Sequence, residues 1–155
     1  MGIGSIFKAT KAKKNLSDSD LDDSVKSAPS GSALLSPEDL INKRFEPTKW
    51  REGYSQYEVD DFLDVVVLEF RRLQKEGKAL RRRVANPELV IDATPQVIIT
   101  PEEVTKQRFK ATKRVGYNLD EVDDFLDEIV YALKTMNLEN QDLAERIAAN
   151  SEKSS

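Results

Sequence analysis

Two stretches of the chain, from about 56 to 85 and from about 120 to 149, place apolar residues at alternating spacings of three and four. Charged residues fill most of the positions between them, and the pattern holds for about four heptads in each stretch, as in a coiled coil. The pattern predicts two long amphipathic helices that pair along an apolar seam. The residues of this predicted oligomerisation seam are Val59, Leu63, Val66, Phe70, Leu73, Leu80, Val84, Val122, Leu126, Ile129, Leu133, Met136, Asn140, Leu143 and Ile147.

Two seam positions are not apolar. A single Asn on a seam costs stability but fixes the register, and Asn140 favours a parallel pair in which it meets its twin in another chain. Gly77 weakens the first helix by roughly 1 kcal/mol relative to Ala. We favour pairing between chains. Pairing within one chain stays open, because a linker of about fourteen residues just spans a helix of roughly 45 Å. Asn140 would then face the layer of Gly77.

The two long helices belong to an internal repeat. Phe109 follows Phe45 by 64 positions, and the run VDDFLD occurs at 59–64 and again at 122–127, an offset of 63. The first copy therefore carries one extra residue between these markers. A repeat this close indicates that the protein consists of two copies of one module and that its function is the function of that module.

Each copy begins with the signature of a helix start. Ser36-Pro37 and Thr100-Pro101 supply a capping hydroxyl and a proline at the first helical position, with acidic residues in the first turn. We expect short helices that reach about Phe45 and Phe109, followed by loops. The remaining structural residues of these loops are the glycines, expected to adopt backbone angles that other residues resist, and the tyrosines, expected to brace the loop: Gly53, Tyr54, Gly116 and Tyr117.

The predicted fold class is all-α and elongated, with two tandem units of short helix, loop and long coiled-coil helix. The expected organisation is a disordered leader over 1–33, a first module over 34–85, an extended linker over 86–98, a second module over 99–149 and a disordered tail over 150–155. The first fourteen residues could instead form a short basic amphipathic helix that touches an anionic membrane.

Composition excludes several classes of function. The chain has no Cys and no His, which rules out disulfides, Cys/His zinc sites and catalytic dyads or triads that need either residue. No apolar run approaches the roughly 18 residues of a membrane-spanning helix. The Asp clusters of the two VDDFLD runs lie at helix starts, where dipole compensation explains them without a metal. We expect no cofactor, no enzyme activity and, despite the basic half of the first long helix, no nucleic-acid partner.

The order of Phe, a short polar and basic loop, Gly-Tyr, and VDDFLD leading into heptads resembles the DivIVA domain of bacterial cell-division and polar-growth scaffolds. The resemblance covers 35–84 and 99–149 and implies a membrane-binding loop at the tip of a parallel coiled coil. In that family the loop before Gly-Tyr presents an aromatic residue and an arginine. Here these are Trp50 and Arg51, whereas the second copy has Arg114 and Val115 and lacks the aromatic. The candidate membrane-binding residues are Lys49, Trp50, Arg51, Lys113 and Arg114.

The resemblance implies a non-enzymatic scaffold or adaptor in cell division, septum placement or polar growth. Its expected partners are a second copy of itself, as a parallel dimer or higher oligomer, an anionic membrane surface, and other division or wall-synthesis proteins. The expected location is the cytoplasm, at the inner face of the membrane at a septum or pole. The alternative is a soluble interaction module that associates with a larger DivIVA-type scaffold without binding membrane.

Overall fold

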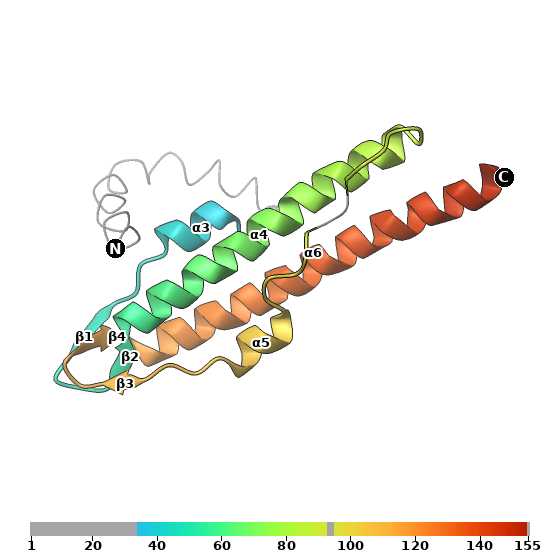
Figure 1. Ribbon diagram of the computed structural model, residues 1–155. Helices are drawn as coiled ribbons and strands as arrows, with labels where there is room; N and C mark the ends of the chain where they lie inside the picture. Colours follow the sequence, from blue (N-terminus) through green and yellow to red (C-terminus); the bar gives the residue numbers. More distant parts are fainter. Residues whose placement is uncertain (1–33, 93–94, 155) are drawn as a thin grey trace, which may run out of the picture.

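The computed structural model describes residues 34–92 and 95–154, and the expectations for the leader lie outside this part of the chain. Two long helices emerge side by side from a small sheet at one end, and a short helix flanks each of them (Figure 1). The elements, in chain order, are α3 (Pro37–Asn42), β1 (Pro47–Lys49), β2 (Gly53–Ser55), α4 (Gln56–Ala85), α5 (Pro101–Lys106), β3 (Ala111–Thr112), β4 (Val115–Tyr117) and α6 (Leu119–Ser154).

Helices α4 and α6 run in the same direction and pack against each other within the single chain (Figure 1). The arrangement that we favoured, pairing between chains, is therefore not the one that the structure shows. Most residues of the predicted seam are buried at this contact, and five are half-buried because they lie at the edge of the contact or toward its open end. The half-buried seam residues are Val84, Leu126, Met136, Leu143 and Ile147.

The short helices begin as expected and end early. The hydroxyls of Ser36 and Thr100 accept hydrogen bonds from backbone N–H groups three residues later, and both capping boxes are complete. The helices end at Asn42 and Lys106 rather than near the two phenylalanines. The chain is extended from there on, which lets each phenylalanine reach across to the other repeat. The ring centroid of Phe45 lies 5.1 Å from that of Tyr117, and Phe109 lies 5.4 Å from Tyr54.

The prediction of an all-α fold is wrong at the base of the helix pair, where the two expected loops form an antiparallel sheet. The strand order is β1-β4-β2-β3, so strands of the two repeats alternate. Thr48 lies opposite Gly116 and Thr112 lies opposite Gly53, which are equivalent pairs in the two repeats. Tyr54 and Tyr117 lie opposite each other near the centre of the sheet. Loops of two or three paired residues carry no strand periodicity, and their partners are more than fifty residues away in the sequence.

The two loop glycines serve close packing rather than an unusual backbone angle, because neither has a positive φ. A Cβ at position 53 would collide with the hydroxyl of Thr48 and lie 2.8 Å from the carbonyl oxygen of Tyr117. A Cβ at position 116 would lie 2.7 Å from the carbonyl oxygen of Tyr54. The expectation about their backbone is therefore corrected: the glycines permit the strands of the two repeats to interleave.

One continuous core joins both repeats. It extends from the sheet along the first half of the α4–α6 contact and includes α3 and α5, which insert Leu40 and Val104 with no exposed surface. The two copies thus share one set of apolar contacts, and burying them together compensates for the small size of each. Farther from the sheet, α6 continues to Ser154, through most of the stretch for which we expected no order.

The linker is held to the side of α4 by a buried ion pair. The guanidinium of Arg72 binds the carboxylate of Glu69 through Nε at 2.9 Å and Nη2 at 2.8 Å. Its Nη1 donates to the carbonyl oxygen of Pro95 at 3.3 Å, and the N–H of Ile98 donates to Glu69 at 2.9 Å. The returning chain thereby satisfies donors and acceptors that the pair alone would leave buried and unpaired.

Candidate functional site

The candidate membrane-binding residues of both repeats meet at one end of the molecule. Lys49 ends β1, which pairs with β4, and the N–H of Trp50 donates to the carbonyl oxygen of Lys113 at 3.0 Å. The loop after β1 and the loop before β4 therefore form a single tip beyond the sheet, opposite to the end where the chain terminates (Figure 1). We call the following set the tip: Lys49, Trp50, Arg51, Glu52, Lys113, Arg114 and Val115.

Trp50 is the most unusual residue of the tip. Its φ is 66°, in the left-handed region that non-glycine residues adopt at a cost of order 1 kcal/mol or more. Its side chain is 80% exposed, although Trp normally buries most of its surface. The Nζ of Lys49 lies 6.0 Å from the ring centroid, at the outer limit of a cation–π contact. Most of the indole surface is exposed to solvent. The extra residue of the first copy is accommodated in this turn.

A second apolar side chain lies on the tip, and sequence reasoning did not include it among the candidate residues. Val115 is 51% exposed and is the register partner of Lys49 in the neighbouring strand. The second copy lacks an aromatic at its tip, but the interleaved sheet brings its valine to the tip that carries Trp50. The alignment of the repeats gave no signal for this, because it compares the two loops and does not pair them.

The tip carries four basic side chains and one acidic one. Lys49, Arg51, Lys113 and Arg114 are exposed, and none of the ion pairs found among the described residues involves them. The acidic member is Glu52, which is also exposed. A compact cationic surface around two exposed apolar groups is suited to an anionic interface with an apolar interior.

Two tyrosine–aspartate pairs fasten the tip to the helices. Tyr54 donates a hydrogen bond to Asp123 at 2.8 Å, and Tyr117 donates to Asp60 at 2.9 Å, so each repeat's tyrosine binds the helix start of the other repeat. Burial raises the pKa of the Tyr117 hydroxyl, and the nearby charge of Asp60 raises it further. Burial also raises the pKa of Asp60, against the opposing effect of the Tyr117 hydrogen bond. These bonds join the sheet behind the tip to the starts of α4 and α6.

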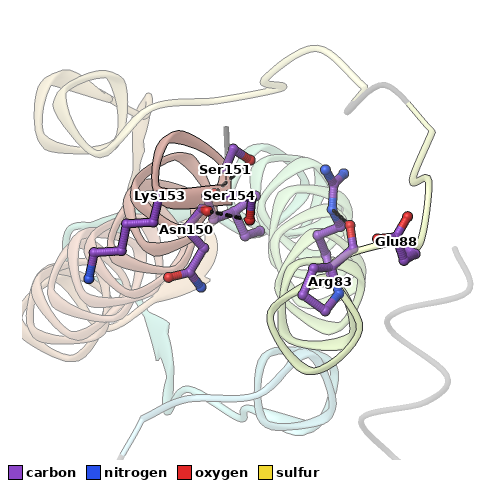
Figure 2. A pocket seen from close by; sticks show the side chains of 8 residues that line it. Arg83, Glu88, Asn150, Ser151, Lys153 and Ser154 are labelled. Carbon is purple, nitrogen blue, oxygen red and sulfur yellow. Dashed lines mark hydrogen bonds between the residues drawn. The ribbon is translucent and has the colours of Figure 1, made fainter.

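The hollow between the ends of α4 and α6 offers no comparable site. It is lined mostly by polar side chains around Ile147 (Figure 2). Arg83 donates to the carbonyl oxygen of Pro87 at 3.1 Å, and Ser154 donates to that of Asn150 at 3.1 Å. These side chains bind their own backbone and converge on no common point. Among residues 34–92 and 95–154, no cluster of three carboxylates could hold a metal ion. No helix in this range is long and apolar enough to cross a membrane.

Comparison with known proteins places the chain in a family. The DivIVA protein family matches residues 35–96 and again residues 99–155. The cell cycle protein GpsB of Geobacillus thermodenitrificans is 32% identical over 71 residues, which are 46% of this chain and 70% of that protein. No solved structure is significantly similar. The two matched segments together form the helical rod and its basic tip, which carries Trp50. The chain belongs to the DivIVA family.

Proposed function

We propose that this protein is a non-enzymatic scaffold or adaptor in bacterial cell division, septum placement or polar growth that contacts the inner face of the cytoplasmic membrane through its tip. Membership in the DivIVA family and similarity to a cell cycle protein support the cell-division role. Its partners would be other copies of itself, the anionic membrane surface and division or wall-synthesis proteins.

The observation that carries the membrane proposal is the state of Trp50. The backbone adopts an unfavourable φ of 66° to hold an indole in solvent, beside Lys49 and Arg51. Indole rings favour the membrane–water interface, and each neighbouring cation contributes about 1 kcal/mol near an anionic leaflet. Val115 would enter the interface beside Trp50, and Lys113 and Arg114 would lie at the level of the headgroups.

The experiment is sedimentation of the purified chain with vesicles of phosphatidylcholine, with and without phosphatidylglycerol. We expect binding only to the anionic vesicles, weakened by salt and abolished by Trp50→Ala with Arg51→Glu. Trp50→Gly is the matched variant for the ring alone, because glycine adopts the positive φ without strain and leaves the sheet intact. Tyr57→Ala, which removes an exposed aromatic on α4 outside the tip, is the control.

The possible outcomes separate the proposals. Binding that is unaffected by both tip variants would assign the contact to another part of the chain, and a Lys-to-Gln variant of the basic residues 8–14 then tests the N-terminal segment. Absence of binding at any salt concentration would reject membrane contact. The alternative function would then hold, a soluble module that associates with a larger scaffold of the same family.

A further inference from the structure

The two long helices carry opposite surfaces at equivalent positions of the repeat. On α4, Lys75, Lys78 and Arg82 follow one another at spacings of three and four and are all exposed. On α6, the positions equivalent to Lys75 and Arg82 hold Leu138 and Glu145, 63 residues later. Because α4 and α6 are paired, equivalent outward positions lie on opposite sides of the rod. One side of the rod is therefore basic where the other is apolar and acidic.

The basic side contains a groove. The returning linker lies along α4 and leaves a hollow that is lined by its three cations on one wall and by apolar linker residues on the other. Val90 is 86% exposed there, and Glu76 is occupied by its contact with Arg72 at 3.1 Å. Asp92 is the remaining acidic residue of the lining. We call this surface the basic groove: Lys75, Lys78, Arg82, Leu89, Val90 and Ile91.

The opposite side presents a ridge of matching character. Tyr131 and Leu138 are 67% and 65% exposed, one heptad apart on the outer face of α6. Two exposed carboxylates continue the same face at spacings of four and three. Asp142 makes an exposed contact with Arg146 at 3.2 Å, which is of the kind that contributes little to stability. We call this surface the acidic ridge: Tyr131, Leu138, Asp142 and Glu145.

We propose that the basic groove of one copy binds the acidic ridge of a second copy, with the rods side by side and parallel. Most of the apolar seam is already buried between α4 and α6 within the chain, so the proposed contact uses the outer surfaces of the rod. In the parallel arrangement, Glu145 faces Arg82, and Leu138 lies beside Lys75 and the exposed linker residues. The two surfaces are different, so the contact is heterologous and repeats without closing, which produces a row of rods.

This inference rests on the proposed function. A parallel row places every tip on the same side, so that all tips can contact one membrane. It specifies how copies associate. Charge complementarity along the groove sets the register and makes the association sensitive to salt.

The test uses full-length chains and two neutral variants. The groove variant is Lys75→Gln, Lys78→Gln and Arg82→Gln, and the ridge variant is Leu138→Ser, Asp142→Asn and Glu145→Gln. All six positions are exposed, so both variants should unfold at temperatures close to the wild type. In sedimentation velocity, we expect wild type to form a concentration-dependent series of oligomers. Each variant alone should stay monomeric, and an equimolar mixture should stop at the dimer, because only one native contact remains in it.

Orientation is tested with introduced cysteines, since the chain has none. Oxidation of a mixture of Arg82→Cys and Glu145→Cys should yield the mixed disulfide dimer, whereas Arg82→Cys with Leu138→Cys, the antiparallel pairing, should yield several-fold less. The opposite yields would overturn the parallel arrangement. A wild type that stays monomeric, a closed dimer, or oligomers unaffected by both variants would overturn the contact itself.

Vesicle sedimentation separates this inference from the proposed function. Both surface variants keep the tip, so they should bind anionic vesicles as monomers. Loss of the oligomer series with retained vesicle binding supports the contact, and retained oligomers with no vesicle binding reject only the membrane role. If cross-linking instead places the acidic leader residues 16–25 in the groove, the leader is the occupant and the proposed contact is wrong.

Discussion

Asn140 fills the space that a side chain at position 77 would occupy. Its Nδ2 donates to the carbonyl oxygen of Leu73 at 3.1 Å, and its Oδ1 lies 2.8 Å from where a Cβ of residue 77 would be. Gly77 and Asn140 are each anomalous on an apolar seam, but together they form one layer of the α4–α6 contact. The polar residue of the layer is 7% exposed and hydrogen-bonded.

This layer predicts that Gly77→Ala lowers stability when Asn140 is present and raises it when Asn140 is replaced by alanine. Gly77→Ala in the wild type should lower the free energy of unfolding by about 1 kcal/mol, because the new methyl group displaces a hydrogen-bonded amide. In an Asn140→Ala background the same change should raise stability by up to about 1 kcal/mol, because only the helix propensity of alanine remains. Urea unfolding of the four proteins of the cycle measures the coupling. Equal effects of Gly77→Ala in both backgrounds would show that the residues are independent.

The interleaved sheet predicts that its glycines are sensitive to the smallest substitution. Gly116→Ala should lower the free energy of unfolding by about 2 kcal/mol, because its methyl group meets the backbone of the opposing strand, which cannot move aside alone. Val115→Ala, at the exposed neighbouring position, is the control and should cost less than about 0.5 kcal/mol. Thermal unfolding followed by circular dichroism compares them. A tolerated alanine at 116 would show that the strands separate more easily than their packing indicates.

The long helices, their starts and the internal pairing geometry could be derived from the sequence, because heptads and capping residues act locally. The capping hydroxyls of Ser36 and Thr100, and that of Ser55 before α4, are examples. The choice of partner helix could not be derived, because the same heptad phase allows pairing within or between chains. For pairing within the chain, the sequence predicts that Asn140 faces the layer of Gly77, and the structure shows this contact.

The sheet and the linker clamp were beyond sequence reasoning for a different reason. Each strand is two or three residues long and gains its partners only after the helices have brought the repeats together. Likewise, Glu69 and Arg72 look like ordinary charged residues of a helix surface, and their contacts with the returning linker could not be predicted. For the tip, the sequence supplied the residue types of each loop, but the union of Trp50 with Val115 required the pairing of β1 with β4.

Stability at high pH should depend on Tyr117. Its pKa is raised in the folded protein, so the native state keeps a proton that the unfolded chain loses above its ordinary value of 10.0. The contribution is therefore present in full below about pH 10 and is lost as the pH rises toward the folded pKa, by at most about 1.4 kcal/mol per pH unit for one proton. Tyr117→Phe should remove most of this slope and cost about 1 kcal/mol at neutral pH through the lost hydrogen bond.

The matched control for this titration is Tyr57→Phe, an exposed tyrosine of α4 outside the tip and outside both proposed contact surfaces. Denaturant unfolding of the three proteins between pH 7 and pH 11 should give parallel curves for wild type and Tyr57→Phe and a flatter curve for Tyr117→Phe. Tyr54, whose pKa is also raised by burial and by Asp123, contributes in the same direction and accounts for the slope that remains. A slope unchanged by Tyr117→Phe would contradict the assignment.

The ion pair of Glu69 and Arg72 predicts that stability and linker anchoring respond differently to substitution. Arg72→Met leaves the Glu69 carboxylate, 1% exposed, without its cation, and should lower the free energy of unfolding by about 3 kcal/mol. Replacing both residues with leucine removes the uncompensated charge and should cost markedly less. Arg72→Met removes the contact to Pro95 but keeps the acceptor of the Ile98 amide, whereas the double variant removes both, so hydrogen exchange at the Ile98 amide should accelerate most in the double variant. Glu76→Gln, at the half-buried edge of the same network, is the control.

If the double variant were as unstable as the single one, burial of the unpaired charge would not be the cause. If exchange at Ile98 stayed slow, the linker would be held by its apolar contacts instead.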